Sequence, residues 1–439
     1  MLLLYNFSIS LYSFGAKIAG LFNPKAKLFS QGRKHIFSNI EKELNQVRVE
    51  RKKQGKQTHI IWVHCSSVGE FEQARPLIES IKRRQPDYFI LLTFFSPSGY
   101  ELRKNYEYAD WVFYLPMDTT HKANKFLNIV QPVKTIFIKY EFWYNYLHGL
   151  KKRNIPTYIV SALFRENQIF FKWYGGFFRK LLTSYNMLFV QDENSKKLLN
   201  SIGIDNVEIS GDTRFDRVYK LLNEKTRKLD IVDAFSQGNK KLWVAGSTWP
   251  EDEKNILMAL NRLPSNKLIL VPHEIFASHI EEICKRFSQY NLIKYSDILA
   301  KLNSFDTSLA ESRKQIKEYF KKIGKADILL VDEIGFLSSL YKYGSFAYIG
   351  GGFGAGIHNI LEAATYGAPI VFGPNYKKFR EANQLIEKGG AFSYISPGEL
   401  VDILEKWLTD ENFLWDTSTV CRNYVSENLG ATELIMANI

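Results

Sequence analysis

Five glycines, Gly350, Gly351, Gly352, Gly354 and Gly356, precede a helical pattern in the segment SFAYIGGGFGAGIHNILEAATYGAPIVFGP, residues 345–374. Residues 345–349 are predicted to form a buried strand, residues 358–366 a helix that Gly367 ends, and residues 369–372 the next strand. A glycine loop ahead of a helix brings backbone N–H groups and the positive helix end close to an anion, usually a phosphate. The spacing fits neither a P-loop nor the G-x-G-x-x-G fingerprint.

Glu362 follows His358 by four residues and Asn359 by three. As a functional residue, its carboxylate would accept hydrogen bonds from ribose hydroxyls while the loop holds the phosphate. The alternative is a capping arrangement, in which Asn359 caps the helix and Glu362 reaches back to it. The five glycines favour the nucleotide site, because capping requires none of them.

Glu70 is the second candidate for chemistry. A predicted strand at residues 60–64 runs into CSSVGEF, and a helix is predicted from about residue 71 to 84. Glu70 would therefore lie at the carboxyl end of a strand, where a carboxylate can act as a general base on an attacking hydroxyl. The alternative is a first-turn glutamate that only complements the helix dipole, which would lower its pKa.

Short apolar runs alternate with helical patterns from residue 60 to 209, which is typical of a parallel sheet covered by helices. The polar passage 219–240 breaks this rhythm and is the predicted linker, and residues 295–325 are interpreted as a helix-prone insertion. Two doubly wound domains around a shared cleft are therefore expected. The predicted strands are 60–64, 88–94, 111–115, 133–138, 157–160, 187–190, 242–245, 267–271, 328–331, 346–349 and 369–372.

Composition narrows the class of protein. A chain of 439 residues with 45% hydrophobic and 24% charged residues is globular and long enough for two domains. Its three cysteines, without a C-x-x-C pair, argue for a reducing compartment and against disulfides or a zinc site. The net charge of +12 predicts an acidic partner. Because no zinc-finger or RNP signature is present, phosphates or a membrane are expected and nucleic acid is not.

Residues 1–24 form an amphipathic helical pattern. Only sixteen residues precede Lys17, fewer than the ~20 that a membrane-spanning helix needs, and the pattern does not fit a signal peptide. We expect a helix in the membrane interface, next to basic residues that meet lipid head groups. The alternative is an ordinary amphipathic helix packed on its own domain. The apolar stripe comprises Leu4, Phe7, Leu11, Phe14, Ile18, Leu21 and Phe22.

Four blocks resemble those of the 3-deoxy-D-manno-octulosonic acid (Kdo) transferases: SVGEF at 67–71, QDE at 191–193, GST at 246–248 and GIHNILEAATYGAPIVFGP at 356–374. The resemblance implies an α/β GT-B fold of two Rossmann-like domains, here an interface helix at 1–24, an acceptor domain at 25–220 and a nucleotide-sugar domain at 221–439. It implies transfer of Kdo from CMP-Kdo to the lipid A precursor lipid IVA, with inversion and without catalytic metal or cofactor. The expected location is the cytoplasmic side of the anionic cell inner membrane.

The same resemblance assigns roles to residues. It makes Glu70 the catalytic base and places Glu141, in KYEFWYN, and Ser67 on the acceptor side. The residues expected to bind the nucleotide sugar are Gly246, Ser247, Thr248, Pro272, His273, Gly352, Gly354, Gly356, His358, Asn359 and Glu362.

Three positions depart from the family pattern. Trp249 stands where a histidine usually follows the GST block, and VPHEIF lacks the expected arginine. The asparagine-alanine-arginine turn reads Ser161-Ala162-Leu163, with an arginine only at 165. Other basic side chains are therefore expected to make some of the contacts to the phosphate or carboxylate. The alternative is that these side chains are ordinary solvated surface residues. The candidates are Arg165, Arg214, Lys377 and Lys378.

Two other readings remain. A GT-B enzyme acting on another nucleotide sugar, such as an epimerase, would need neither a lipid acceptor nor an amphipathic N-terminus. The other alternative is a basic, membrane-bound nucleotide-binding protein without catalysis. Such a protein would bind CMP but transfer no sugar, so Glu70→Gln would have no transfer rate to reduce.

Overall fold

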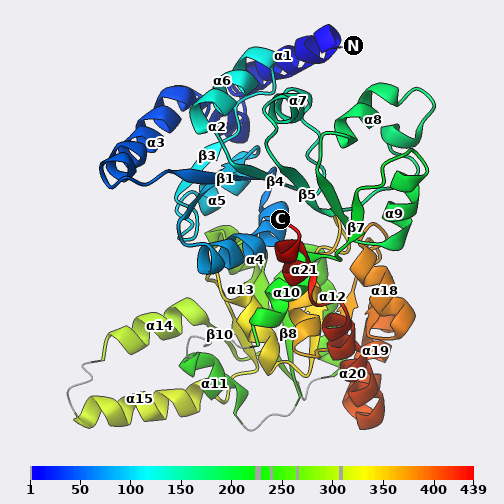
Figure 1. The fold of residues 1–439 in the computed structure, drawn as a ribbon. Helices are drawn as coiled ribbons and strands as arrows, with labels where there is room; N and C mark the ends of the chain where they lie inside the picture. Colours follow the sequence, from blue (N-terminus) through cyan, green and yellow to red (C-terminus); the bar gives the residue numbers. More distant parts are fainter. Residues whose placement is uncertain (1, 223–228, 238–240, 264–265, 306–309) are drawn as a thin grey trace. The chain divides into compact units, whose positions relative to one another are not determined.

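The structure is a computed structural model that describes residues 2–222, 229–237, 241–263, 266–305 and 310–439 (Figure 1). The chain forms two compact units, of which the first contains Met1–Arg217 and Asn428–Ile439 and the second contains Val218–Glu427. The predicted ranges 25–220 and 221–439 assign residues 428–439 to the second domain, whereas these residues pack with the first unit. Parts of the predicted linker, 223–228 and 238–240, lie outside the described residues.

The first unit is built on a seven-stranded parallel sheet with the order β3-β2-β1-β4-β5-β6-β7. Its strands are β1 His59–Cys65, β2 Tyr88–Phe94, β3 Trp111–Tyr114, β4 Lys134–Ile138, β5 Thr157–Ala162, β6 Met187–Val190 and β7 Val207–Ile209. Its helices are α1 Leu2–Ala19, α2 Pro24–Gln31, α3 Ile36–Lys53, α4 Val68–Arg84, α5 Pro97–Arg103, α6 Thr120–Val130, α7 Tyr144–Lys152, η1 Ile169–Phe171, α8 Gly176–Leu182, α9 Glu193–Asn200, α10 Thr213–Lys220 (which runs into the second unit) and α21 Ala431–Ala437.

Strand β1 shows why these segments become central strands. Ile60 and Trp62 face one hydrophobic core, and Ile61 and Val63 face the other. A strand buried on both faces requires a continuous apolar run instead of an alternating pattern. Because helices cover both faces, the first unit has the doubly wound arrangement expected from the sequence.

The second unit repeats this architecture with the order β10-β11-β9-β8-β12-β13-β14, also parallel. Its strands are β8 Leu242–Thr248, β9 Lys267–Pro272, β10 Leu292–Lys294, β11 Ile328–Leu330, β12 Phe346–Ile349, β13 Ile370–Phe372 and β14 Ala391–Ser393. Its helices are α11 Asp230–Ser236, α12 Pro250–Arg262, α13 Ala277–Arg286, α14 Tyr295–Asn303, α15 Ala310–Ile323, α16 Leu337–Leu340, η2 Tyr341–Tyr343, α17 Leu361–Thr365, α18 Arg380–Lys388, α19 Pro397–Thr409 and α20 Glu411–Glu427.

The strand order reverses once in each sheet. In the first unit the chain moves from β1 to β3 on one side and then continues with β4 on the other side of β1. In the second unit, β8 and β12 flank the corresponding point. Ligands of doubly wound sheets bind outside the carboxyl ends of the strands at such a reversal. The segments after β1 and β4, and those after β8 and β12, are therefore the places to look for a site.

Helix α1 is attached to the first unit through polar side chains. Tyr5 Oη donates to Asp118 Oδ2 (2.7 Å) and Asn6 Nδ2 donates to Thr120 Oγ1 (3.0 Å). The apolar stripe of residues 1–24 faces away from the unit, with 48% to 86% of each side chain exposed. The helix therefore packs on its own unit, as the alternative states, while its apolar stripe stays exposed, as an interface helix requires. Across the described ranges, the combination of length and hydrophobicity needed to cross a membrane is met by no helix.

Candidate active site

Glu70 lies in the first turn of α4, just beyond the carboxyl end of β1. Its Oε2 accepts the backbone N–H groups of Ser66 (2.5 Å) and Ser67 (3.0 Å). The helix predicted from residue 71 begins at Val68, because Ser67 is its N-cap and the carboxylate of Glu70 satisfies N–H groups that precede the helix. Glu70 thus forms a capping box with Ser67, which the sequence analysis did not predict at this helix, and these bonds fix the position of the carboxylate.

The electrostatic setting of Glu70 differs from the expected one. Burial, followed by the negative charge of Glu141, raises the pKa of Glu70 to about 7, although the two N–H bonds and Lys139 act to lower it. The expectation that the helix dipole lowers this pKa is therefore wrong, since desolvation and a like charge outweigh it. A carboxylate with a pKa near 7 can both accept and release a proton at neutral pH.

Glu141 follows β4 and is almost fully buried, with 2% of the residue exposed. Its Oε2 accepts the indole N–H of Trp143 and lies 3.1 Å from His64 Nε2. His64, on β1, is in turn 2.8 Å from Thr93 Oγ1 through Nδ1. The chain therefore holds Glu141 from two sides, and its charge acts on Glu70. The sequence analysis did not identify this contact between His64 and Glu141.

Non-glycine residues adopt left-handed backbone conformations at the carboxyl edges of both sheets. Lys139 directly follows β4 with φ of 68°, Ser161 lies near the end of β5 with φ of 53°, and Ser247 lies near the end of β8 with φ of 55°. Such conformations are uncommon outside glycine and cluster at functional sites. The sequence analysis missed Lys139, although its place after a strand adjacent to β1 was a usable signal.

Two of the substitute basic residues lie at the same edge of the first unit. The guanidinium of Arg165 is 3.5 Å from the hydroxyl of Tyr140, and both Arg214 and Glu70 act electrostatically on that hydroxyl. Arg214 also forms an ion pair with Asp212 at 2.8 Å. The first unit thus gathers Glu70, Glu141 and these cations at one sheet reversal.

In the second unit, the GST turn and the glycine loop touch each other. The N–H of Gly350 donates to the carbonyl of Gly246 (2.9 Å), and a Cβ on Gly350 would lie 2.1 Å from the carbonyl oxygen of Ser247. A Cβ on Gly246 would lie 2.1 Å from the hydroxyl of the buried Tyr341. Only glycine fits at both positions, so the backbones after β8 and β12 form a closely packed pair.

Asp252 organises this pair and was not singled out from the sequence. Its Oδ2 accepts the N–H groups of Trp249 and Gly351, both at 2.9 Å, and its Oδ1 accepts the hydroxyl of Tyr348 at 2.7 Å. Burial raises the pKa of Asp252. One carboxylate therefore ties the start of α12 to the glycine loop. The usable signal was the run of acidic residues after Pro250.

The helix predicted at residues 358–366 is shorter than expected, since α17 begins at Leu361. The N–H of His358 donates to Gly350 O, and the Asn359 side chain accepts the N–H of Leu361 (3.1 Å) and donates to Glu362 (3.1 Å). These bonds hold residues 358 and 359 in the loop, so the positive helix end does not lie at His358–Asn359. The capping alternative for Asn359 and Glu362 is therefore present in the geometry, and the ribose role of Glu362 stays a prediction.

The glycine loop uses part of its own hydrogen-bonding capacity. The N–H groups of Gly354 and Gly356 both donate to Gly351 O, at 3.0 and 3.2 Å. The N–H groups of these two glycines are therefore already bonded within the loop, while no such bond is found for the N–H of Gly352 in the described part of the chain. A hollow of about 430 Å³ lies beside the loop, lined by Gly354, Ala355 and the basic residues Lys377 and Lys378 among others.

Three rings stack beside the GST turn. The ring of His273, which follows Pro272 at the end of β9, lies 4.8 Å from Trp249 and 4.3 Å from His358, each within 30° of parallel. The indole N–H of Trp249 donates to His358 Nε2 at 3.2 Å. Burial, with the charge of His273, lowers the pKa of His358 to about 4. The departure at Trp249 thus builds a stack with the two histidines instead of supplying a third histidine.

The remaining predicted residues are placed as follows. Thr248 is buried at the end of β8, and its hydroxyl lies 3.4 Å from Glu253. Ser67 caps α4 next to Glu70, as described above. Within the described ranges, no group of three or more histidine, cysteine or acidic side chains forms a metal site.

Comparison with known proteins gives consistent matches. Residues 40–217 match the family model of 3-deoxy-D-manno-octulosonic-acid transferase (kdotransferase). A 3-deoxy-D-manno-octulosonic acid transferase of Aquifex aeolicus is 28% identical over 357 residues, which cover 80% of this chain and 86% of that protein. A bifunctional glycosyltransferase/methyltransferase of Fusobacterium nucleatum is 26% identical over 405 residues, or 88% of this chain, but the chain spans only 58% of that protein's length.

Among solved structures, UDP-GlcNAc 2-epimerase from Neisseria meningitidis superposes with a TM-score of 0.56, covering 87% of this chain and 99% of that chain at 14% identity. At this identity the similarity concerns the fold alone. The paired doubly wound sheets and the matched transferases define the class, a glycosyltransferase with the GT-B fold. Within that class, the chain is similar to the Kdo transferases, whose family model matches residues 40–217.

Proposed function

We propose that the protein transfers Kdo from CMP-Kdo to a hydroxyl of the lipid A precursor lipid IVA, with inversion and without a catalytic metal. The observation that carries this proposal is Glu70, a positioned carboxylate with a pKa near 7 at the reversal of the first sheet. A general base for an attacking hydroxyl requires this combination of place and basicity. The similarity to the Kdo transferases supports the chemical identity of the sugar.

In the proposed reaction, Glu70 takes the proton of the acceptor hydroxyl as its oxygen forms a bond to the anomeric carbon of Kdo. The bond from that carbon to the phosphate oxygen breaks, and CMP leaves with the electron pair. Because CMP is a stabilised anion, no second carboxylic acid is required to protonate the leaving group, in contrast to glycosidases. Glu141 keeps Glu70 basic through its negative charge.

The second unit is proposed to hold the nucleotide. The turn Gly246–Thr248, the ring stack of Trp249, His273 and His358, and the loop with Asn359 and Glu362 all lie at the reversal between β8 and β12. Lys377 and Lys378, at the hollow beside Gly354, are proposed to supply the positive charge that the missing arginines do not. Positively charged side chains beside the phosphate stabilise the departing anion as the glycosidic bond breaks.

Helix α1 is proposed to bind the cytoplasmic face of the anionic inner membrane through its exposed stripe. Burying Phe7, Leu11 and Phe14 in the interface removes apolar surface from water, and nearby basic side chains add electrostatic attraction. A chain lacking residues 1–22 should lose binding to vesicles and keep CMP binding. Retention of the truncated chain on vesicles would contradict the anchor and leave the transferase proposal intact.

The decisive assay is incubation with CMP-Kdo and tetra-acylated lipid IVA, with the product read by mass. Wild type and Glu79→Gln should both form the Kdo adduct, because Glu79 lies on α4 away from the reversal and pairs with Arg75. A chelator should leave the rate unchanged. Turnover of a UDP-sugar without lipid, and none of CMP-Kdo, would instead favour the alternative of a GT-B enzyme acting on another nucleotide sugar.

A further inference from the structure

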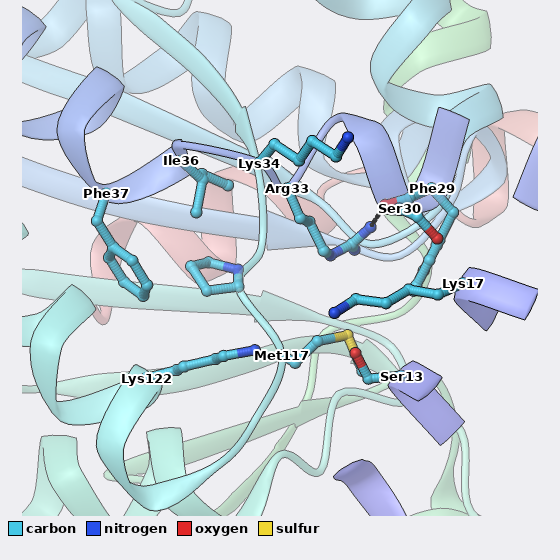
Figure 2. A pocket seen from close by; sticks show the side chains of 11 residues that line it. Ser13, Lys17, Phe29, Ser30, Arg33, Lys34, Ile36, Phe37, Met117 and Lys122 are labelled. Atoms are coloured by element: carbon cyan, nitrogen blue, oxygen red, sulfur yellow. Dashed lines mark hydrogen bonds between the residues drawn. The ribbon is translucent and has the colours of Figure 1, made fainter. Parts of the chain in front are cut away.

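A small pocket lies in the first unit between α1, α2, the start of α3 and α6, apart from the residues at the sheet reversal. Its volume is about 160 Å³. Its polar lining includes Ser13 and Lys17 of α1, Lys122 of α6, and Arg33 and Lys34 from the segment between α2 and α3. Figure 2 shows Lys17 and Lys122 reaching in from opposite sides, below the guanidinium of Arg33. None of these residues was assigned a catalytic or donor-binding role.

The charge in this pocket is unbalanced. Four cationic side chains line it, and no aspartate or glutamate does. In the described part of the chain, the side chains of Lys17, Lys34 and Lys122 make neither a hydrogen bond nor an ion pair. Burial and the positive charges of Lys17 and Arg33 lower the pKa of Lys122, so these three cations act on one small volume.

The position of Lys122 adds a second observation. It lies in the first turn of α6, a turn without an acidic residue. The helix dipole disfavours a cation there and favours an anion. A bound anion would relieve both this unfavourable placement and the mutual repulsion of the lysines.

Arg33 gives the pocket a fixed wall. Its guanidinium donates to three backbone carbonyls, those of Leu115 (2.9 Å), Phe29 (2.9 Å) and Phe95 (2.7 Å). It also lies 3.8 Å from the centre of the Phe29 ring. These contacts leave N–H capacity on both terminal nitrogens. Burial lowers the pKa of Arg33 to about 10, which keeps it charged at neutral pH.

We propose that this pocket binds the phosphate monoester of a membrane lipid, held by Lys17, Lys122 and Arg33. A phosphate monoester carries up to two negative charges and three acceptor oxygens, which suits several converging cations better than a singly charged diester. The volume of about 160 Å³ is below the ~300–1,000 Å³ typical for drug-sized ligands. The pocket therefore takes a head group and not a whole lipid.

The lipid source follows from α1. Lys17 and Ser13 line the pocket, while Phe14 and Ile18 on the same helix are 61% and 48% exposed. A head group in the pocket would leave its acyl chains beside this exposed stripe. The inference rests on the proposed function in one respect, because it needs α1 at a membrane.

The test compares vesicles of phosphatidylcholine mixed with phosphatidic acid, a monoester, or with phosphatidylglycerol, a diester, at equal surface charge. Flotation of the full chain should show roughly fivefold or greater preference for phosphatidic acid. Lys17→Gln/Lys122→Gln should reduce this ratio to about one. Lys25→Gln/Lys27→Gln, which removes the same charge from exposed positions of α2 that do not line the pocket, should keep it. Arg33 is left unchanged, because its three carbonyl bonds support the fold.

The outcomes separate the possibilities. An absent preference in wild type, or an equal loss in both double variants, would overturn the pocket. Calorimetry with inorganic phosphate distinguishes the source: binding as tight as that of phosphatidic acid vesicles would overturn the assignment to a lipid. Circular dichroism of both variants guards against unfolding. Kdo transfer by wild type to a detergent-solubilised acceptor is measured in parallel and does not depend on the pocket. Absence of this transfer would contradict the proposed function, whereas absence of the lipid preference alone would contradict only the pocket.

Discussion

The two sheet reversals of this protein lie at corresponding points of their sheets, after the first strand of each, and differ in their chemistry. After β1 and β4, the chain gathers charged side chains, and burial followed by the negative charge of Glu141 raises the pKa of Glu70. After β8 and β12, it gathers backbone and rings, with glycines where a Cβ would clash and a histidine whose pKa lies near 4. The first reversal is suited to moving a proton, and the second to packing closely against a ligand. Shared topology therefore fixes where a site forms, while local residues decide what it does.

The largest expected effect is the loss of the proton acceptor. Glu70→Gln should reduce kcat for Kdo transfer by roughly 10²- to 10⁴-fold, because the amide cannot take the proton of the acceptor hydroxyl. Binding of CMP should stay unchanged, since the nucleotide is assigned to the other reversal. Mass-detected transfer and calorimetry measure the two quantities, and an unaffected rate would remove Glu70 from the mechanism.

A smaller effect is expected from the close packing of the second reversal. Gly350→Ala should destabilise folding by about 2 kcal/mol, because its Cβ would lie 2.1 Å from Ser247 O. Gly354→Ala is the matched control, since its Cβ would have only one neighbour, at 3.8 Å. Urea unfolding should separate the two variants, and equal midpoints would show that the loop is not held against the GST turn.

The charges around Glu70 predict opposite shifts of the pH profile. The rate should rise with pH through about 7, where Glu70 loses its proton. Lys139→Gln removes a positive charge that lowers the pKa of Glu70, so the rising limb should move to higher pH. Glu141→Gln removes the negative charge that raises the pKa, so the limb should move to lower pH. The pH dependence of kcat/KM measures both, and shifts in the same direction would contradict the electrostatic account.

The smallest effect concerns stability. The folded state raises the pKa of Glu70 from an ordinary value of 4.5 to about 7, so it binds the proton more tightly than the unfolded chain does. This group therefore lowers stability as pH rises from about 4.5 through about 7, and the loss persists above that range. Glu70→Gln should raise Tm at pH 8 relative to wild type by more than at pH 5. A difference in Tm between the variant and wild type that stays constant across pH would show that folding does not raise the pKa of Glu70.

Much of the fold was readable because the central strands are continuous apolar runs. Strand β2 has the predicted bounds, and β1 differs from its prediction by one residue at each end. The strands β7, β10 and β14 were not predicted, because they are short and only partly buried and so form no apolar run. The equally short β11 and β13 were predicted, because all three of their residues are apolar and buried. The helix predicted at 358–366 was overextended, because the bond from His358 N–H to Gly350 O is a tertiary contact that local propensity does not contain.

The positions of candidate residues were easier to predict than their environments. Glu70 was singled out from its place after a strand, but its raised pKa depends on burial and on Glu141, which is 71 positions later in the sequence. Asp252 was overlooked for the same reason, since its partner Gly351 lies 99 positions away. Neither relationship leaves a local trace. Spacing identifies which residues can do chemistry, and long-range packing sets their proton affinity.

The return of residues 428–439 to the first unit has a consequence for biogenesis. Arg84, at the end of α4, pairs with Glu433, and Ile435 of α21 is fully buried against the core that contains Phe71 and Leu77 of α4. The ribosome must therefore translate the whole second unit before α4 receives its cover. A nascent chain that stalls before residue 428 would present an uncovered apolar surface to chaperones and proteases, so the helix that carries Glu70 is fully packed only after α21 has been translated.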